Sequence, residues 1–139
     1  MTDMVEFELV SPERLVKSLS VGMVVVPCSE GDIGVLPGHT PLIGTVRPGV
    51  VDIHEDGKVL ESIFVSGGFV EVTPERCTLL AEEATAVGDL NQDEAQARLE
   101  AGKRALEKAS SEVEKSNAEA DIKTAEAMLA AMDVETTAH

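Results

Sequence analysis

The distribution of alanine divides this chain of 139 residues into two parts that favour different secondary structures. Residues 1–80 contain no alanine, whereas residues 81–139 contain fifteen, and all six prolines lie at or before Pro74. Alanine is the strongest helix former and proline the weakest, while the Val and Ile of the first part favour strands. The sequence therefore predicts an α+β fold, with a β-rich domain over residues 1–88 and a helical part over residues 89–139.

Apolar and polar residues alternate with a period of two along much of the first part, as expected for strands with one buried face. The clearest runs cover residues 5–9, 51–54 and 59–65. Asp56-Gly57 lies between the last two runs and predicts a tight hairpin turn. Short strands separated by many glycine and proline turns are typical of a sandwich or a barrel.

In the second part the apolar residues recur with the period of a helix. One stripe includes Leu99 and Leu106, and another includes Ile122 and Leu129. Burial of each large apolar side chain contributes about 1.5 to 3 kcal/mol, whereas ordering each residue costs about 1 to 2 kcal/mol in backbone entropy. Because few large apolar residues are present, we expect this helical pair to depend on docking and to be the mobile part of the chain.

Two capping signals set the expected helix starts. Asn91 followed three residues later by Glu94 has the spacing of a capping box, and Ser116 followed by Glu119 repeats it. These signals predict a helical hairpin with helices over about residues 91–109 and 117–132. Ser111 with Glu114 is a competing start for the second helix.

Acidic residues dominate the charge, with 26 Asp plus Glu against 11 Lys plus Arg and a formal net charge of −15. Nucleic acid and anionic lipid need clustered Lys and Arg, so a basic protein surface is the expected partner. The longest apolar stretch, Ala127–Met132, is too short to span a bilayer, and direct membrane insertion is not expected. No transit peptide precedes the first strand at Val5, which predicts a bacterial chain kept in the cytoplasm.

The sequence offers no catalytic or metal-binding constellation. Cys28 and Cys77 lie far apart without CxxC spacing, so we expect two reduced thiols. The histidines His39, His54 and His139 are scattered and make no ligand set. Adjacent acids flank expected turns or solvated faces, so we expect no general acid or base, no metal and no cofactor.

Residues 30–42, EGDIGVLPGHTPL, are the most unusual stretch of the chain. They are glycine-rich like a phosphate-binding loop, but they lack its lysine and carry two carboxylates that repel phosphate. Tight glycine turns stiffened by proline indicate a shaped loop offered to a partner, and an ordinary connection between strands is the alternative. Within the loop, Pro37, Gly38 and His39 predict a structural turn fixed by a hydrogen bond of the histidine.

Four segments, in this order along the chain, closely resemble the epsilon subunit of bacterial F-type ATP synthases. They are Phe7–Pro12, Glu30–Leu42, Arg47–Gly49 and Val65–Val72. The elements EGDxGxLPGHxPL and SGGxxEV make the resemblance specific, and it extends over residues 5 to about 84. Beyond that point it depends on the layout of the helical hairpin.

This resemblance implies an N-terminal β-sandwich followed by an antiparallel helical hairpin, in a non-catalytic subunit of the central rotor. Such a subunit binds gamma and the c-ring and couples them to ATP synthesis. By resemblance, Glu30, Gly31 and Asp32 form the c-ring interface, and Ser11 lies at the gamma interface. The implied location is peripheral, at the cytoplasmic face of the bacterial inner membrane, in a proton-translocating complex.

The hairpin departs from the family pattern in two respects. Members that bind ATP carry an LDxxRA-like element, but Asn91 and Glu94 stand here in place of its Asp and Arg, so nucleotide binding is not expected. Inhibitory members contact the catalytic head, its alpha and beta subunits, through a basic second helix, whereas residues 110–139 hold two basic and seven acidic side chains. We expect weak or absent inhibition of ATP hydrolysis, and a regulatory ATP-sensing inhibitor is the alternative.

Overall fold

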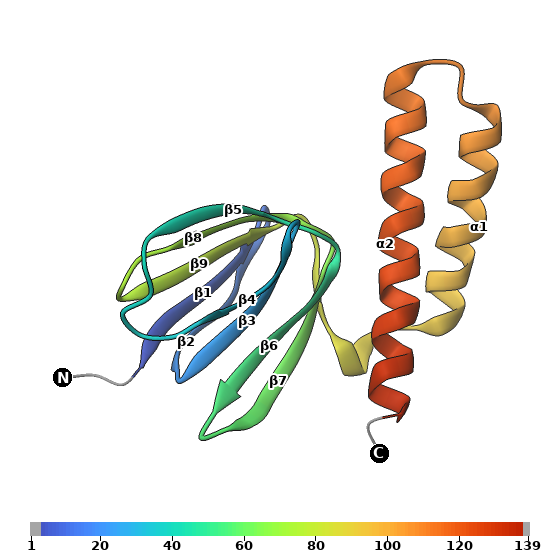
Figure 1. Ribbon diagram of the computed structural model, residues 1–139. Helices are drawn as coiled ribbons and strands as arrows, with labels where there is room; N and C mark the ends of the chain where they lie inside the picture. Colours follow the sequence, from blue (N-terminus) through green and yellow to red (C-terminus); the bar gives the residue numbers. More distant parts are fainter. Residues whose placement is uncertain (1–3, 138–139) are drawn as a thin grey trace. The chain divides into compact units, whose positions relative to one another are not determined.

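The computed structural model describes residues 4–137 and divides into two compact units, one ending at Ala86 and one beginning at Val87 (Figure 1). In the described residues the first unit holds ten strands: β1 (Val5–Ser11), β2 (Arg14–Val21), β3 (Met23–Cys28), β4 (Gly31–Val35), β5 (Leu42–Val46), β6 (Gly49–Glu55), β7 (Lys58–Val65), β8 (Gly68–Val72), β9 (Arg76–Ala81) and β10 (Ala84–Ala86). The second unit holds a short 3₁₀ helix, η1 (Val87–Asp89), and two α-helices, α1 (Gln92–Lys108) and α2 (Glu112–Thr137). The predicted α+β fold is therefore confirmed.

The strands pair in the order β10-β7-β6-β3-β5-β8-β9-β1-β2, and β4 pairs with β3 outside this path. The pairs are antiparallel except for β1 with β9, which is parallel. β3 meets β5 at Cys28 and Val46, where the path passes from one layer of the sandwich to the other. Each layer then presents alternate side chains to the interior, as the period of two in the sequence requires.

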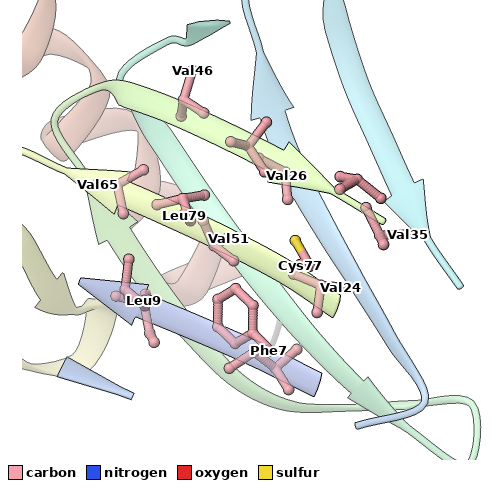
Figure 2. Close-up of a cluster of buried hydrophobic side chains, with 14 of the residues drawn as sticks. Phe7, Leu9, Val24, Val26, Val35, Val46, Val51, Val65, Cys77 and Leu79 are labelled. Atoms are coloured by element: carbon pink, nitrogen blue, oxygen red, sulfur yellow. The ribbon is translucent and has the colours of Figure 1, made fainter. Parts of the chain in front are cut away.

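The core of the first unit is built mainly from aliphatic side chains of both layers. Phe7 and Leu9 of β1 lie in one cluster with Val24 of β3, Val51 of β6 and Leu79 of β9 (Figure 2). All five side chains are fully buried. These residues include the alternating apolar positions of the sequence, so burial of one strand face accounts for the pattern.

Two backbone positions require glycine for different reasons. In the β6–β7 hairpin the predicted turn is confirmed, because Asp56 and Gly57 take φ angles of 53° and 77°, as the mirror-image hairpin turns demand. Gly68 at the start of β8 has a φ of +148°, and a Cβ atom there would lie 1.8 Å from the carbonyl oxygen of Leu80. The backbones of β8 and β9 therefore approach too closely for any side chain.

The second helix of the hairpin begins earlier than the sequence suggested. α2 starts at Glu112 instead of near residue 117, and the connection shrinks to residues 109–111. The competing signal decides the start: the Glu114 N–H donates to Ser111 Oγ at 3.1 Å, and Glu114 Oε1 accepts from the Ser110 N–H at 2.9 Å. Ser116, the expected cap, lies inside the helix. α2 also extends past residue 132, to Thr137.

The first helix follows its prediction within one residue at each end. Asn91 is its N-cap and accepts a hydrogen bond of 3.0 Å from the Glu94 N–H. α1 packs against α2 through buried Leu99 and Gly102. A Cβ atom on Gly102 would lie 2.9 Å from Cγ1 of Ile122, so the two helices are in close contact at this level.

We predict that Gly68→Ala lowers the free energy of unfolding by roughly 4 kcal/mol or more, because the β8–β9 ladder must separate to admit the methyl group. The matched control is Gly57→Ala, where φ is also positive, at +77°, but no atom lies within 4 Å of the added Cβ. That change should cost about 1 to 2 kcal/mol through backbone strain alone. Urea unfolding followed by circular dichroism measures both, and equal losses would contradict the steric argument.

Candidate functional site

The acidic turn singled out from the sequence is the exposed tip of the β3–β4 hairpin. Ser29 and Glu30 form its two-residue loop, because Cys28 pairs with Gly31 across its base. All four residues from Ser29 to Asp32 are exposed. Gly31 has a φ of 133°, a conformation that favours glycine. The structure thus brings Glu30, Gly31 and Asp32 together on one projecting turn.

This turn is fastened to the segment that joins β5 to β6. The Ser29 N–H donates to the Thr45 carbonyl at 2.8 Å, and the Arg47 N–H donates to the Pro27 carbonyl at 2.9 Å. The Arg47 guanidinium adds two further bonds, one to the Cys28 carbonyl and one to Asp32 Oδ1 at 2.6 Å. Sequence reasoning did not link Arg47 to the turn, because the two are adjacent only through strand pairing.

Pro37, Gly38 and His39 form a tight turn after β4. The His39 N–H donates to the Leu36 carbonyl at 3.1 Å, and Gly38 has a φ of +84°. The Gly38 N–H also donates to the Pro74 carbonyl at 2.7 Å, which ties the turn to the β8–β9 connection. The His39 ring nitrogen Nδ1 lies 2.7 Å from the Thr40 carbonyl oxygen. The histidine is thus engaged with backbone within the turn.

A row of mostly apolar side chains crosses the outer face of five strands; Val10 is half-buried and the other four members are exposed. Cross-strand pairing places Thr45 of β5, Phe69 of β8, Leu80 of β9, Val10 of β1 and Leu15 of β2 in register. The three large members are more than half exposed: 60% for Phe69, 53% for Leu80 and 55% for Leu15. We call these five residues the apolar row. Sequence reasoning missed it, since its members come from strands far apart in the chain.

The apolar row adjoins both sequence-predicted interface positions. Ser11 follows Val10 at the end of β1, and Thr45 accepts the hydrogen bond from Ser29 of the acidic turn. Farther along the same strands the outer face is mostly polar, with Arg76 paired to Glu8 at 2.7 Å, but Ile43 of β5 is 77% exposed there. One end of this sheet face is therefore mostly apolar and lies next to the acidic turn, and the other end carries charged side chains.

The two cysteines are buried and reduced. Burial, and to a smaller extent the neighbouring Cys28, raise the pKa of Cys77 to about 12. Burial also raises the pKa of Cys28, although the nearby Arg47 guanidinium opposes this shift. Both thiols stay protonated at neutral pH. Among the described residues, no group of three or more His, Cys, Asp and Glu side chains could hold a metal ion.

The remaining candidate residues serve local structure or lie elsewhere. The Asn91 side chain is engaged as the cap of α1, and His54 is half-buried in β6 opposite Val59. His139 lies outside the described residues. Neither α1 nor α2, as far as the structure describes them, combines the length and apolar character needed to cross a membrane.

The described residues therefore form a β-sandwich with an exposed apolar row and a separate unit of two helices. The family model that matches residues 4–87 is described as the ATP synthase, Delta/Epsilon chain, beta-sandwich domain. The chain is 54% identical over 132 residues to the ATP synthase epsilon chain of Paramagnetospirillum magneticum, covering 95% of this chain and 99% of that protein. It is 52% identical over 131 residues to the ATP synthase epsilon chain of Rhodospirillum rubrum, covering 94% and 98%.

Solved structures share the fold. A chain of the Euglena gracilis mitochondrial ATP synthase matches with a TM-score of 0.79 at 21% identity, over 95% of this chain and 83% of that one. A chain of the Tetrahymena thermophila mitochondrial ATP synthase matches with a TM-score of 0.68 at 14% identity, over 92% and 96%. Because the family model spans residues 4–87 and these bacterial relatives are 54% and 52% identical over nearly their whole length, the chain belongs to the ATP synthase delta/epsilon family, and the resemblance found in the sequence is confirmed. The relatives are named as a chain of a larger complex, in agreement with the expected non-catalytic subunit.

We predict that stability falls above pH 8.5 through Cys77. An unfolded cysteine has a pKa of about 8.5, so the unfolded chain releases a proton that folded Cys77, with its pKa of about 12, retains. The contribution is fully present below that pH and declines by roughly 1.4 kcal/mol per pH unit above it. The chain has no Tyr to obscure the slope. Urea unfolding between pH 7 and 10 measures it.

Cys77→Ala should remove most of this alkaline slope while lowering stability at neutral pH by leaving a cavity. Cys28→Ala is the matched control and should alter the slope less, since Arg47 opposes the pKa shift of Cys28. An unchanged slope in Cys77→Ala would contradict the assignment.

Proposed function

We propose that this chain is the non-catalytic central-rotor subunit of a proton-translocating F-type ATP synthase, where it binds gamma and the c-ring and couples them to ATP synthesis. The observation that carries the proposal is the apolar row with the acidic turn at its side. Family membership supports the choice of complex. The solved structures of similar fold belong to mitochondrial ATP synthase assemblies, one comprising F1 with the c-ring and the other the central stalk with the c-ring.

The apolar row supports a protein partner because it exposes large side chains that gain free energy when they leave water. Phe69 lies on β8, between Thr45 of β5 and Leu80 of β9, and offers a rigid aromatic anchor of the type that dominates binding energy at interfaces. Ser11 borders the row, and we assign the row and Ser11 to gamma. The sheet beneath is fixed by its core, so binding needs little reordering of the backbone.

The acidic turn supports the second contact. Glu30, Gly31 and Asp32 project from the sandwich on a turn held by backbone and Arg47 hydrogen bonds. A projecting acid is complementary to basic polar loops, and such complementarity sets orientation and the rate of association. We assign this turn to the c-ring loops. The subunit then lies peripherally at the cytoplasmic face of the bacterial inner membrane, bound through its partners.

The hairpin is assigned a structural role, with weak or absent inhibition of ATP hydrolysis. Residues 110–139 carry two Lys and seven Asp plus Glu, which gives a net charge of −5 and repels the acidic loops that a basic helix would bind. Asn91 is engaged as a helix cap, and Glu94 adds a carboxylate where an arginine would bind polyphosphate. These features disfavour the alternative, an ATP-sensing inhibitor that acts through contacts with alpha and beta.

We predict that Phe69→Ser weakens binding of the full chain to a gamma–c-ring subcomplex by about 30-fold or more, the loss typical of a buried interface anchor. Leu60→Ser is the matched control, because Leu60 and Phe69 are both 60% exposed but Leu60 lies on β7, outside the row. The control should change affinity less than about twofold, within the usual range for surface substitutions. Interferometry measures both affinities. Equal losses of affinity for the two variants would contradict the assignment of the row as the binding surface.

We predict that deleting residues 89–139 leaves ATP hydrolysis by the assembled complex within about twofold of the intact level, a change below 0.5 kcal/mol in the activation free energy. The measurement is steady-state hydrolysis after confirmed co-purification of the truncated chain with gamma. A large rise would restore the inhibitory role. Titration of the isolated full chain with ATP checks the sensing alternative separately, and saturable binding would support it.

A further inference from the structure

The two acids of the turn at residues 29–32 have different surroundings. Asp32 pairs with Arg47 through a bond of 2.6 Å between Oδ1 and Nη2. In the described part of the chain, the Glu30 carboxylate has no hydrogen-bond or ion-pair partner, and Glu30 is exposed at the tip. The sequence presents the two carboxylates as equivalent, but only one of them is an uncompensated charge.

Arg47 contacts both strands of the hairpin at its base. One guanidinium nitrogen donates to the carbonyl of Cys28 at the end of β3, and the other donates to Asp32 in β4. Its backbone N–H donates to the Pro27 carbonyl. A planar guanidinium with two parallel donors can bridge a carbonyl and a carboxylate in this way, whereas a lysine ammonium cannot hold both in one geometry.

The hairpin needs such a bridge because its own ladder is weak. β4 is an edge strand that pairs with β3 alone in the sheet order, and it contains Gly31 and Gly34. Glycine within a strand loses more backbone entropy on ordering and packs no side chain. Pro27 of β3 stands opposite Asp32 and has no N–H to donate to any neighbour.

We infer that Arg47 is the positioning residue of the acidic turn, with Asp32 as its anchor, and that Glu30 is the acid that a basic partner surface recognises. The identity of that surface, the polar loops of the c-ring, rests on the function proposed above. The positioning itself depends only on contacts within this chain, so the two can be tested apart.

The first experiment measures hydrogen exchange of the isolated full chain at the Ser29 and Arg47 amides, which donate across the base of the turn. Both side chains of the pair are partly exposed, so Arg47→Gln should accelerate exchange by about two- to fivefold. Arg47→Lys should restore little of the protection, because it keeps the charge without the paired donors. Arg76→Gln is the matched control: it breaks another exposed Arg–carboxylate pair, of 2.7 Å with Glu8, and should leave these amides unchanged.

A double-mutant cycle tests whether Arg47 and Asp32 protect these amides as a pair or independently of each other. Asp32→Asn should accelerate exchange at the same amides, and the double variant Arg47→Gln/Asp32→Asn should show little more acceleration than either single change. Additive accelerations, or protection unaltered in Arg47→Gln, would overturn the positioning role.

The second experiment measures binding of the same variants to the gamma–c-ring subcomplex, and the sign of the Arg47 effect is decisive. Removing a positive charge beside an acidic turn should strengthen binding to a basic surface if charge alone acts. Positioning predicts the opposite, a loss of affinity in Arg47→Gln that parallels faster exchange. Glu30→Gln should weaken binding without altering exchange. Tighter binding of Arg47→Gln would overturn the inference. If exchange changes as expected while Glu30→Gln binds normally, the turn is positioned by Arg47 but is not the c-ring contact.

Discussion

The parallel pairing of β1 with β9 is the interaction on which the rest of the first unit depends. It brings the start of the chain beside its last long strand, so Phe7 and Leu9 enter the core next to Cys77 and Leu79. The same register carries Val10 to Leu80 on the opposite face. One pairing therefore fixes both the buried cluster and the exposed row, because alternate residues of a strand face opposite sides of the sheet.

Sequence patterns predicted what is local and missed what is long-range. Period-two alternation identified β1, β6 and β7, and Asp56-Gly57 identified a hairpin turn, because both signals depend on neighbouring residues alone. The start of α2 was misplaced since Ser111 and Ser116 each precede a glutamate by three residues. The additional bonds from Ser110 to Glu114 distinguish the two sites, and spacing does not reveal them. The order of the strands in the sheet could not be predicted from the sequence patterns, because strand pairing and register are set by tertiary contacts.

The candidate site shows the same division. The acidic turn and the Pro37–His39 turn could be located from glycine and proline positions. The inequality of Glu30 and Asp32 could not, since it depends on Arg47, fifteen residues after Asp32 and on a different strand connection. The apolar row was hidden for a related reason: its exposed apolar residues Leu15, Phe69 and Leu80 come from three different strands, and each alone is unremarkable. Strand pairing brings these residues together into one surface, the apolar row.

The contact between Gly102 and Ile122 has a mechanical consequence for the hairpin. Because Gly102 has no side chain, the Ile122 side chain packs closely against α1 at this level, and the interlocked surfaces of α1 and α2 resist sliding along each other. Bending one helix would require bending both, so the packed pair resists bending more strongly than a single helix does. Within the second unit, α1 and α2 are then expected to keep their register along each other when the pair is under load.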